Sequence, residues 1–246
     1  MLLGGLQKTT LVDFPGKIAC TVFTVGCNFR CPFCHNRDLI TIKLFEKSGI
    51  APIDENYFFT FLKKRRKILD GVCITGGEPT LQPDLLPFCR KIKKLGLKTK
   101  LDSNGSNPQV LKKAIQEKVV DFIAMDVKTA FGEYEKAVGI KFPEEKVKQS
   151  IKIILSSGLD YELRTTLVPG IHSQKTIIEM AQQLKRMNEK YNRSPKNFVW
   201  IFQNFRPQGC LDKKMEKVKP FTSRQLEKFL KAAQKILPQT RLRDKM

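Results

Sequence analysis

The feature that most constrains the fold is a regular alternation of apolar segments with helix-like segments. Amphipathic helical patterns, bounded by helix start and stop signals, lie between most of the apolar segments. Strands that alternate with helices predict a parallel α/β fold. Six apolar segments are typical of buried strands: Ile18–Val25, Val72–Thr75, Lys98–Asp102, Val119–Val127, Tyr161–Val168 and Phe198–Gln203.

The number of βα units narrows this fold class. Six units are too few for an eight-stranded barrel, so we expect a partial (β/α)6 TIM-like barrel or an open twisted sheet. In both architectures ligands bind at the carboxyl ends of the strands. The chain has 246 residues, 41% of them hydrophobic, and no linker-like tract, which predicts a single domain over residues 1–246.

Caps and prolines mark the expected helices. Asp54 is expected to open the first helix, which would end near Leu69. Thr222 and Gln225 have the capping-box spacing of a final helix over about residues 222–237. The basic run Lys63–Lys67 follows apolar residues at helical spacing, so we expect it on the solvent side of the first helix.

Charge and cysteine content limit the functional classes. The 45 Lys and Arg against 24 Asp and Glu give a net charge of +21, which attracts acidic partners or nucleic acid. No RNA-recognition motif or zinc-finger spacing accompanies the scattered lysines, so we expect solvated helix exteriors and no nucleic-acid partner. Seven cysteines, an odd number, favour reduced thiols. Without a membrane-length apolar run or a signal-peptide pattern, the chain is expected to be cytoplasmic.

The strongest local motif is a cysteine triplet directly after the first expected strand. Cys27, Cys31 and Cys34 lie within eight residues, so their thiolates can bind one soft metal centre. With three cysteines, a [4Fe–4S] cluster keeps one iron open for a reactant. The alternative is a structural zinc site completed by His35, which would make the chain a basic binding module. Neighbouring residues rarely ligate one tetrahedral ion together, and the spacing therefore favours the cluster.

Further polar motifs follow the next strands. The glycines of Gly76–Pro79 allow close approach of the backbone to a ligand. Asp102–Gly105 and Asp126–Lys128 follow the third and fourth strands, and Arg164 offers a guanidinium that can bind a carboxylate in bidentate fashion. Charged groups inside a core-facing pattern are costly unless they are paired or bound to a ligand. We therefore expect one ligand site at the edge that also holds the cysteine loop.

Taken in order, GCNFRCPFCHN, GGEP, LDSNG, MDVK and LRTTLVPG resemble the radical S-adenosylmethionine (SAM) superfamily, and more narrowly the activating enzymes of glycyl-radical enzymes. The opening TTLVDFPGKIACTVFTVGCNFRCPFCHN is most similar to the anaerobic ribonucleoside-triphosphate reductase activating proteins, relatives of pyruvate formate-lyase activating enzyme. The resemblance extends from about Lys8 to about Gly209. It implies a radical SAM barrel with its core at about residues 8–209.

The resemblance implies an oxidoreductase that cleaves SAM reductively at a [4Fe–4S] cluster held by Cys27, Cys31 and Cys34. The resulting 5′-deoxyadenosyl radical would generate a glycyl radical on a partner enzyme under anaerobic conditions, with a flavodoxin- or ferredoxin-type protein as electron donor. A monovalent cation is implied at Asp102, Ser103 and Asp126, and Asp13 would receive the partner's glycine loop. The implied SAM contacts are Phe33 at the adenine, Gly76, Gly77 and Glu78 at the methionyl amino group, Asp102 and Lys128 at the amino acid part, and Arg164 at SAM or the loop.

The chain departs from the formate-lyase pattern near its sixth expected strand. Gln203–Pro207 stands where that relative has a SAM-contacting histidine, so Asn204 is the predicted ribose contact. His172 is expected to be a turn or cap residue, and His35 and Asn36 to shape the cysteine loop. Two alternatives stay open: a radical SAM enzyme that acts on a small molecule or nucleic acid, and an activator of another glycyl-radical enzyme such as pyruvate formate-lyase. The other cysteines are expected to be core or surface thiols: Cys20, Cys73, Cys89 and Cys210.

Overall fold

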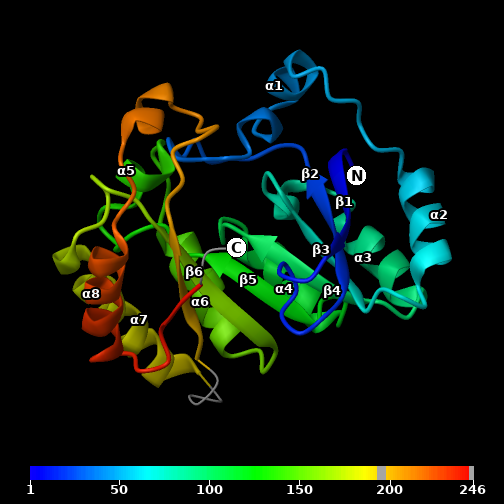
Figure 1. Ribbon diagram of the computed structural model, residues 1–246. Coiled ribbons are helices and arrows are strands. Elements are labelled where there is room, and N and C mark those ends of the chain that lie inside the picture. The colour runs from blue at the N-terminus through cyan, green and yellow to red at the C-terminus, as the bar shows by residue number, and fades with distance from the viewer. Residues whose placement is uncertain (193–197, 244–246) are drawn as a thin grey trace. The chain divides into compact units, whose positions relative to one another are not determined.

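The structure, a computed structural model, describes residues 1–192 and 198–243 (Figure 1). Contacts within the chain divide it into two compact units. The first unit comprises Met1–Asn28, Asn36–Ser103 and Gln109–Ala124, and the second comprises Phe29–His35, Asn104–Pro108 and Met125–Met246. Each unit has its own strands, helices and buried apolar side chains.

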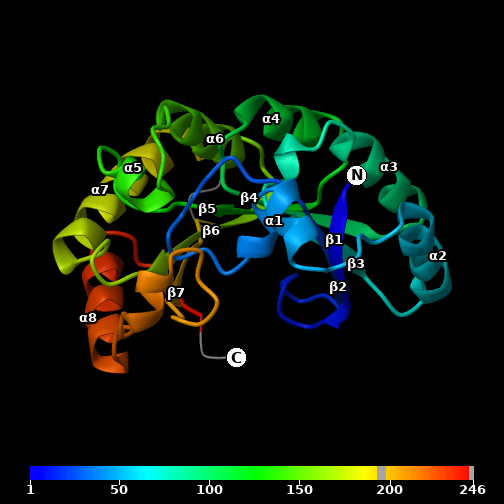
Figure 2. The same cartoon turned by 90° about the horizontal axis from the view of Figure 1, so that it is seen from above.

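The first unit contains a sheet in which neighbouring strands follow chain order. β1 (Leu3–Thr10) pairs antiparallel with β2 (Ala19–Thr24), and β3 (Gly71–Gly76) and β4 (Lys98–Ser103) continue the sheet in parallel. α2 (Glu55–Arg65) and α3 (Leu85–Lys94) lie side by side (Figure 2), where Phe58 stacks on Phe88 with ring centroids 5.3 Å apart. The helices that contribute to this unit are α1 (Ile42–Lys47), α2 (Glu55–Arg65), α3 (Leu85–Lys94) and α4 (Pro108–Gln116).

The paired strands of the second unit run parallel to one another. β6 (Asp160–Leu167), β7 (Trp200–Asn204) and β8 (Arg241–Leu242) are hydrogen-bonded neighbours in that order. β5 (Phe122–Asp126) contributes its first three residues to the first unit and its last two to the second. The helix α7 (Gln174–Tyr191) packs against α6 (Glu145–Leu155) and α8 (Ser223–Gln234) (Figure 2). The helices of this unit are α5 (Tyr134–Val138), α6 (Glu145–Leu155), α7 (Gln174–Tyr191) and α8 (Ser223–Gln234).

The expected α/β class is confirmed, because every expected strand forms and the described pairings are parallel except β1 with β2. Two strands were not expected. β1 reads LGGLQKTT, in which adjacent glycines and polar residues hide the strand signal, and β8 has only two residues. The expected segment Val119–Val127 is shortened to β5, because the Val119 N–H closes the end of α4 on the Ala114 carbonyl (3.1 Å).

The helix caps lie where the sequence predicts them, whereas two helices end earlier than predicted. Asp54 accepts a hydrogen bond from Tyr57 N–H, and Thr222 and Gln225 form the expected capping box. α2 ends at Arg65 rather than near Leu69, because the chain turns there toward β3, and α8 ends at Gln234. The lysines of the basic run at the end of α2 are exposed, as expected. No helix in the described ranges has both the length and the apolar composition that a bilayer crossing requires.

Candidate functional site

The start of the cysteine loop is held by the two residues that follow β3, Gly77 and Glu78. Glu78 N–H donates to the Gly26 carbonyl at 2.7 Å, and Gly77 N–H donates to the Thr24 carbonyl at 2.8 Å. A Cβ at Gly77 would lie only 2.2 Å from the Gly26 carbonyl oxygen, so a side chain there is excluded without movement of the loop. Two backbone segments, each carrying part of a predicted site motif, therefore pack directly on each other immediately before Cys27.

Gly76 and Glu78 complete this part of the site. Gly76 adopts φ +111°, a conformation that favours glycine, and its carbonyl accepts a 2.9 Å hydrogen bond from Asn36 Nδ2. Glu78 is fully buried, and its Oε1 accepts hydrogen bonds from Thr80 Oγ1 (2.5 Å) and from Ser103 Oγ (2.9 Å). A buried carboxylate held by neutral donors is stabilised further by a positively charged ligand group such as an amino group.

The rest of the cysteine loop, Phe29–His35, belongs to the second unit and is held by the segment after β7. The carbonyls of Pro32 and Cys34 accept hydrogen bonds from the two successive N–H groups of Leu211–Asp212, each at 3.0 Å. His35 Nε2 lies 2.6 Å from the Arg206 carbonyl oxygen. His35 and, in the first unit, Asn36 thus fix the backbone around the cysteines, in agreement with the role expected for them.

Neither the three cysteines of the motif nor the other four, which are all buried, form a disulfide within the described ranges. Cys31 is buried, whereas Cys27 and Cys34 are half-buried. Among the residues that the structure describes, no group of three or more His, Cys, Asp or Glu side chains is arranged as a metal site. Cys27 lies in the first unit and the other two in the second. Three soft sulfur donors on one short loop fit an iron–sulfur cluster in donor chemistry.

The ammonium group of Lys128 provides the electrostatic environment of the cysteines in the second unit. Burial alone would lower the pKa of Lys128, but Asp126 and the nearby thiols of Cys31 and Cys34 raise it above its usual value. The same ammonium lies 6.0 Å from the ring centroid of Phe33, which is 5% exposed. A cation close to a thiol favours the thiolate, the form in which cysteine binds a metal.

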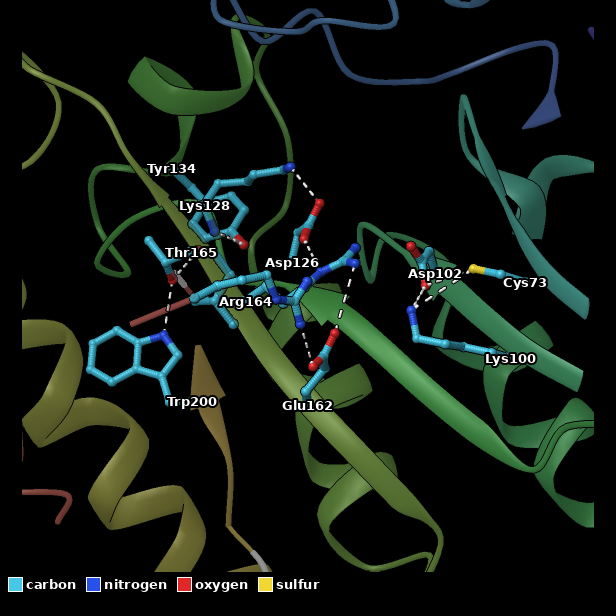
Figure 3. Close-up of polar contacts among 12 residues, drawn as sticks. Cys73, Lys100, Asp102, Asp126, Lys128, Tyr134, Glu162, Arg164, Thr165 and Trp200 are labelled. Carbon is cyan, nitrogen blue, oxygen red and sulfur yellow. Dashed lines mark hydrogen bonds and ion pairs between the residues drawn. The ribbon is translucent and has the colours of Figure 1, made fainter. Parts of the chain in front are cut away.

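Lys128 belongs to a chain of ion pairs in the second unit (Figure 3). Asp126 Oδ2 lies 2.8 Å from Lys128 Nζ, and Asp126 Oδ1 lies 3.0 Å from Arg164 Nε. Burial opposes ionisation of Asp126, but the two cations outweigh it and hold the pKa of this carboxyl below its usual range. Arg164 also lies 3.9 Å from Glu162, which in turn pairs with Arg243 at 2.7 Å.

The backbone of Lys128 is fixed as firmly as its side chain. Its N–H donates to the Tyr134 hydroxyl (3.1 Å), and its carbonyl lies 3.0 Å from His172 Nε2. Val168 N–H donates to His172 Nδ1 at 3.0 Å, so Nε2 carries the ring proton and donates to Lys128. Burial lowers the pKa of His172 to about 4. His172 is therefore a neutral residue that connects the loop after β6 to the loop after β5.

A buried polar row crosses the first unit's sheet on one face, and Figure 3 shows the end of it at Cys73, Lys100 and Asp102. The register places Thr21, Cys73 and Lys100 side by side on β2, β3 and β4. Thr21 Oγ1 donates to Asp13 Oδ2 (2.5 Å) at one end. At the other end Lys100 Nζ lies 2.5 Å from Asp102 Oδ1 and 3.9 Å from Cys73 Sγ. The row thus contains two residues expected from the sequence, Asp13 and Asp102, and a lysine that was not.

Asn204 lines a cavity of about 670 Å³ at the ends of β6 and β7 in the second unit. Thr166, Gln203 and Arg206 contribute to the same wall. Asn204 Nδ2 donates to the Phe221 carbonyl (2.9 Å), whereas its buried Oδ1 has no hydrogen-bond partner within the described ranges. A buried unpaired acceptor beside a cavity is suited to a ligand that brings a hydroxyl or N–H donor.

Within each unit, the structure brings some of the predicted residues into direct contact. In the first unit Glu78 and Ser103 share a hydrogen bond, and in the second Asp126 joins Lys128 and Arg164. Arg164 was expected at a strand end but lies inside β6. The sequence analysis did not identify three charged residues of these networks: Lys100 in the polar row of the first unit, and Glu162 and Arg243 in the ion-pair chain of the second. The strand spacing i, i+2 between Lys100 and Asp102, which places both side chains on one face, could have identified the first of them.

Comparison with protein families identifies the class of protein to which this fold and cysteine motif belong. The model of the radical SAM superfamily matches residues 21–184, more than half of the chain. The protein belongs to the radical SAM superfamily. Membership makes it an enzyme and implies a [4Fe–4S] cluster and SAM as its cofactors.

Relatives named for glycyl-radical activation match almost the full length. A Methanocaldococcus jannaschii protein with the provisional name of a glycyl-radical enzyme activating enzyme is 29% identical over 241 residues, which cover 96% of this chain and 93% of that protein. The pyruvate formate-lyase-activating enzyme of Clostridium pasteurianum is 26% identical over 237 residues, 92% of this chain and 95% of the enzyme.

Solved structures share the fold at low sequence identity. SuiB of Streptococcus suis bound to its precursor peptide SuiA superposes with a TM-score of 0.66 at 14% identity over 91% of this chain. This chain spans 48% of SuiB. Spore photoproduct lyase with a dinucleoside spore photoproduct gives a TM-score of 0.60 at 10% identity, with 89% of this chain and 74% of the lyase covered.

Proposed function

We propose that this protein is a radical SAM activating enzyme that generates a glycyl radical on a partner enzyme, most specifically an anaerobic ribonucleoside-triphosphate reductase. The full-length relatives named for glycyl-radical activation support the class of reaction. The observation that carries the proposal in this chain is the close packing of Gly77 on Gly26, which holds the cysteine loop against a buried carboxylate. The resemblance of the opening segment to reductase activating proteins supports the choice of partner.

The proposal assigns the cluster to Cys27, Cys31 and Cys34. When bound, the cluster supplies the electron that cleaves SAM into methionine and a 5′-deoxyadenosyl radical, which takes a hydrogen atom from a glycine Cα of the partner. A flavodoxin- or ferredoxin-type protein in the cytoplasm is proposed to deliver that electron. Residues 1–246 are proposed to act as one radical SAM domain.

The side chains of this protein bind and orient SAM in this proposal. Glu78 offers a buried carboxylate to the methionyl amino group, and the Gly76–Gly77 backbone leaves room for it. Lys128 and Arg164 offer cations to the methionyl carboxylate. The unpaired Oδ1 of Asn204 offers an acceptor to a ribose hydroxyl. The remaining assignments follow the family resemblance: Phe33 at the adenine, Asp102 at the amino acid part of SAM, and Asp13 at the partner's glycine loop.

Anaerobic reconstitution tests the first half of the proposal. The protein is loaded with iron and sulfide, reduced with dithionite and measured by EPR with and without SAM. A cluster signal that changes shape on addition of SAM is expected, because SAM binds at the open iron. The Cys31→Ala variant is the matched control and should give no such signal. Uptake of one zinc ion without a cluster signal would instead indicate the basic zinc module.

Incubation with candidate partners tests the second half. The reduced, SAM-loaded enzyme is mixed separately with an anaerobic ribonucleoside-triphosphate reductase and with pyruvate formate-lyase from the same organism. A glycyl-radical EPR doublet on the reductase alone is the expected result. A doublet only on the lyase would move the assignment to the pyruvate formate-lyase activators. Formation of 5′-deoxyadenosine with a doublet on neither would favour a small-molecule or nucleic-acid substrate.

A further inference from the structure

The most unusual charged residue outside the expected site is Lys100. Its side chain is only 1% exposed, although it stands in the middle of β4. Lysine is almost never buried without a partner, because removal of an ammonium group from water is costly. The partner here is Asp102, whose Oδ1 lies 2.5 Å from Lys100 Nζ.

The surroundings of this ammonium group are arranged to accept a cation. Cys73 lies beside Lys100 on the neighbouring strand, with Sγ 3.9 Å from Nζ. The ring of Phe122 presents its face to the ammonium at 5.8 Å from the centroid. A carboxylate, a soft sulfur and an aromatic face thus surround one positive charge, and β4 holds the lysine and the aspartate on the same side of the sheet.

The monovalent cation expected at Asp102, Ser103 and Asp126 does not fit this arrangement. Asp102 is already paired with Lys100, and Asp126 is paired with both Lys128 and Arg164. A metal ion bound at either carboxylate would lie next to an ammonium or guanidinium group, and like charges at such short range repel each other strongly at a partly buried position.

We propose that Lys100 is a positioning residue whose ammonium group takes the place of the monovalent cation at Asp102. Lys100 neutralises and orients the Asp102 carboxylate from within the sheet, so that the carboxylate stands ready at the amino acid part of SAM without a metal ion. This inference rests on the proposed SAM site. It makes the enzyme independent of sodium and potassium, because the charge that these ions would supply is built into the chain.

The test compares Lys100→Met with Lys98→Met in the reconstituted full-length protein. Methionine keeps most of the length of the side chain and removes the charge, and Lys98 lies on the same strand but is exposed. SAM affinity is measured by the EPR change, and thermal unfolding by circular dichroism. Both are recorded in choline chloride and in sodium or potassium chloride at equal ionic strength. Sodium binding is measured separately from the line width of ²³Na NMR.

In the wild type and in Lys98→Met we expect less than about a twofold change in SAM affinity between choline and sodium, with no saturable ²³Na broadening. In Lys100→Met we expect roughly a tenfold or larger loss of SAM affinity in choline and a Tm lower by roughly 10 °C. Sodium or potassium should restore part of both, because a metal ion can then occupy the vacated position. The double variant Lys100→Met with Asp102→Asn should recover the Tm without added salt.

Saturable sodium binding by the wild type, accompanied by tighter SAM binding, would overturn the inference. The ²³Na measurement needs no variant, so the inference stays testable even if Lys100→Met does not fold. Failure of the proposed function looks different. In that case no SAM-dependent EPR change occurs in any salt, while sodium binding and the salt response of Tm still decide whether Lys100 replaces the cation.

Discussion

Substitution of Gly77 by alanine tests how the cysteine loop is held. The added Cβ would lie 2.2 Å from the Gly26 carbonyl oxygen, and the obstructing atoms are backbone rather than a flexible side chain. Either the loop after β3 or the segment before Cys27 must therefore move by about 1 Å. Overpacking of this kind costs about 1–3 kcal/mol, and weakening of the two hydrogen bonds to Gly26 and Thr24 adds about 1 kcal/mol.

The expected loss of stability is thus about 2–4 kcal/mol, or about 5–15 °C in Tm for a chain of this length. The variant should also bind less iron and sulfide, because displacement of the Gly26 backbone displaces Cys27. Gly5→Ala is the matched control, since its Cβ would meet Phe23 at an ordinary 3.5 Å. Thermal unfolding and iron analysis are measured on both variants. If Gly77→Ala matches Gly5→Ala in Tm and in cluster content, the close packing has no role in holding the loop.

Three further predictions concern single side chains. Cys34→Ala should lose the cluster absorbance but keep its Tm within about 2 °C, because the side chain is half-exposed on a loop; a collapsed melt would contradict this. Asp13→Ala should keep 5′-deoxyadenosine formation while the glycyl-radical yield on the partner falls about tenfold or more; an equal loss of both would place Asp13 at SAM instead. Because the pKa of His172 is about 4 when folded and ordinary when unfolded, the wild type should lose about 3 kcal/mol of stability as pH falls from 6.5 to 4. Urea unfolding should show a flatter pH dependence for His172→Asn, and an unchanged slope would refute the assignment.

The strands were predictable where the apolar residues of the sequence are also the residues that the fold buries. β2 and β3 are apolar along most of their length, and their strand signals needed no tertiary information. β1 was missed for a physical reason. Its two glycines contribute no side chains to an apolar pattern. Glycine is needed at position 4 because a Cβ there would lie 2.6 Å from the side chain of Leu39, a residue distant in sequence. The residues of β1 are therefore determined by tertiary packing, and their own propensities do not predict the strand.

The sequence predicted which strand ends carry the residues of the candidate site, but it did not predict which of these residues form ion pairs or hydrogen bonds with each other. The glycines after β3 and the acidic residues at the ends of β4 and β5 stand where the sequence placed them. The lysines of the KTK segment, by contrast, look alike in the sequence, although one is exposed and Lys100 is buried. Both side chains lie on the same face of β4, and they differ because Lys98 stands at the start of the strand opposite Gly71, whereas Lys100 stands farther in, opposite the buried Cys73.

The ion-pair chain of the second unit has a consequence for how this protein can evolve. Glu162 pairs with Arg164 on its own strand and with Arg243 beyond β8, and Arg164 pairs in turn with Asp126. Replacement of the buried glutamate alone would remove the carboxylate that Arg243 and Arg164 share, and Asp126 would then face both Arg164 and Lys128 as the remaining acid of the ion-pair chain. We therefore expect Asp126, Glu162, Arg164 and Arg243 to be substituted together in evolution. Arg243 would thus covary with Asp126 at the end of β5, although the two are far apart in the sequence.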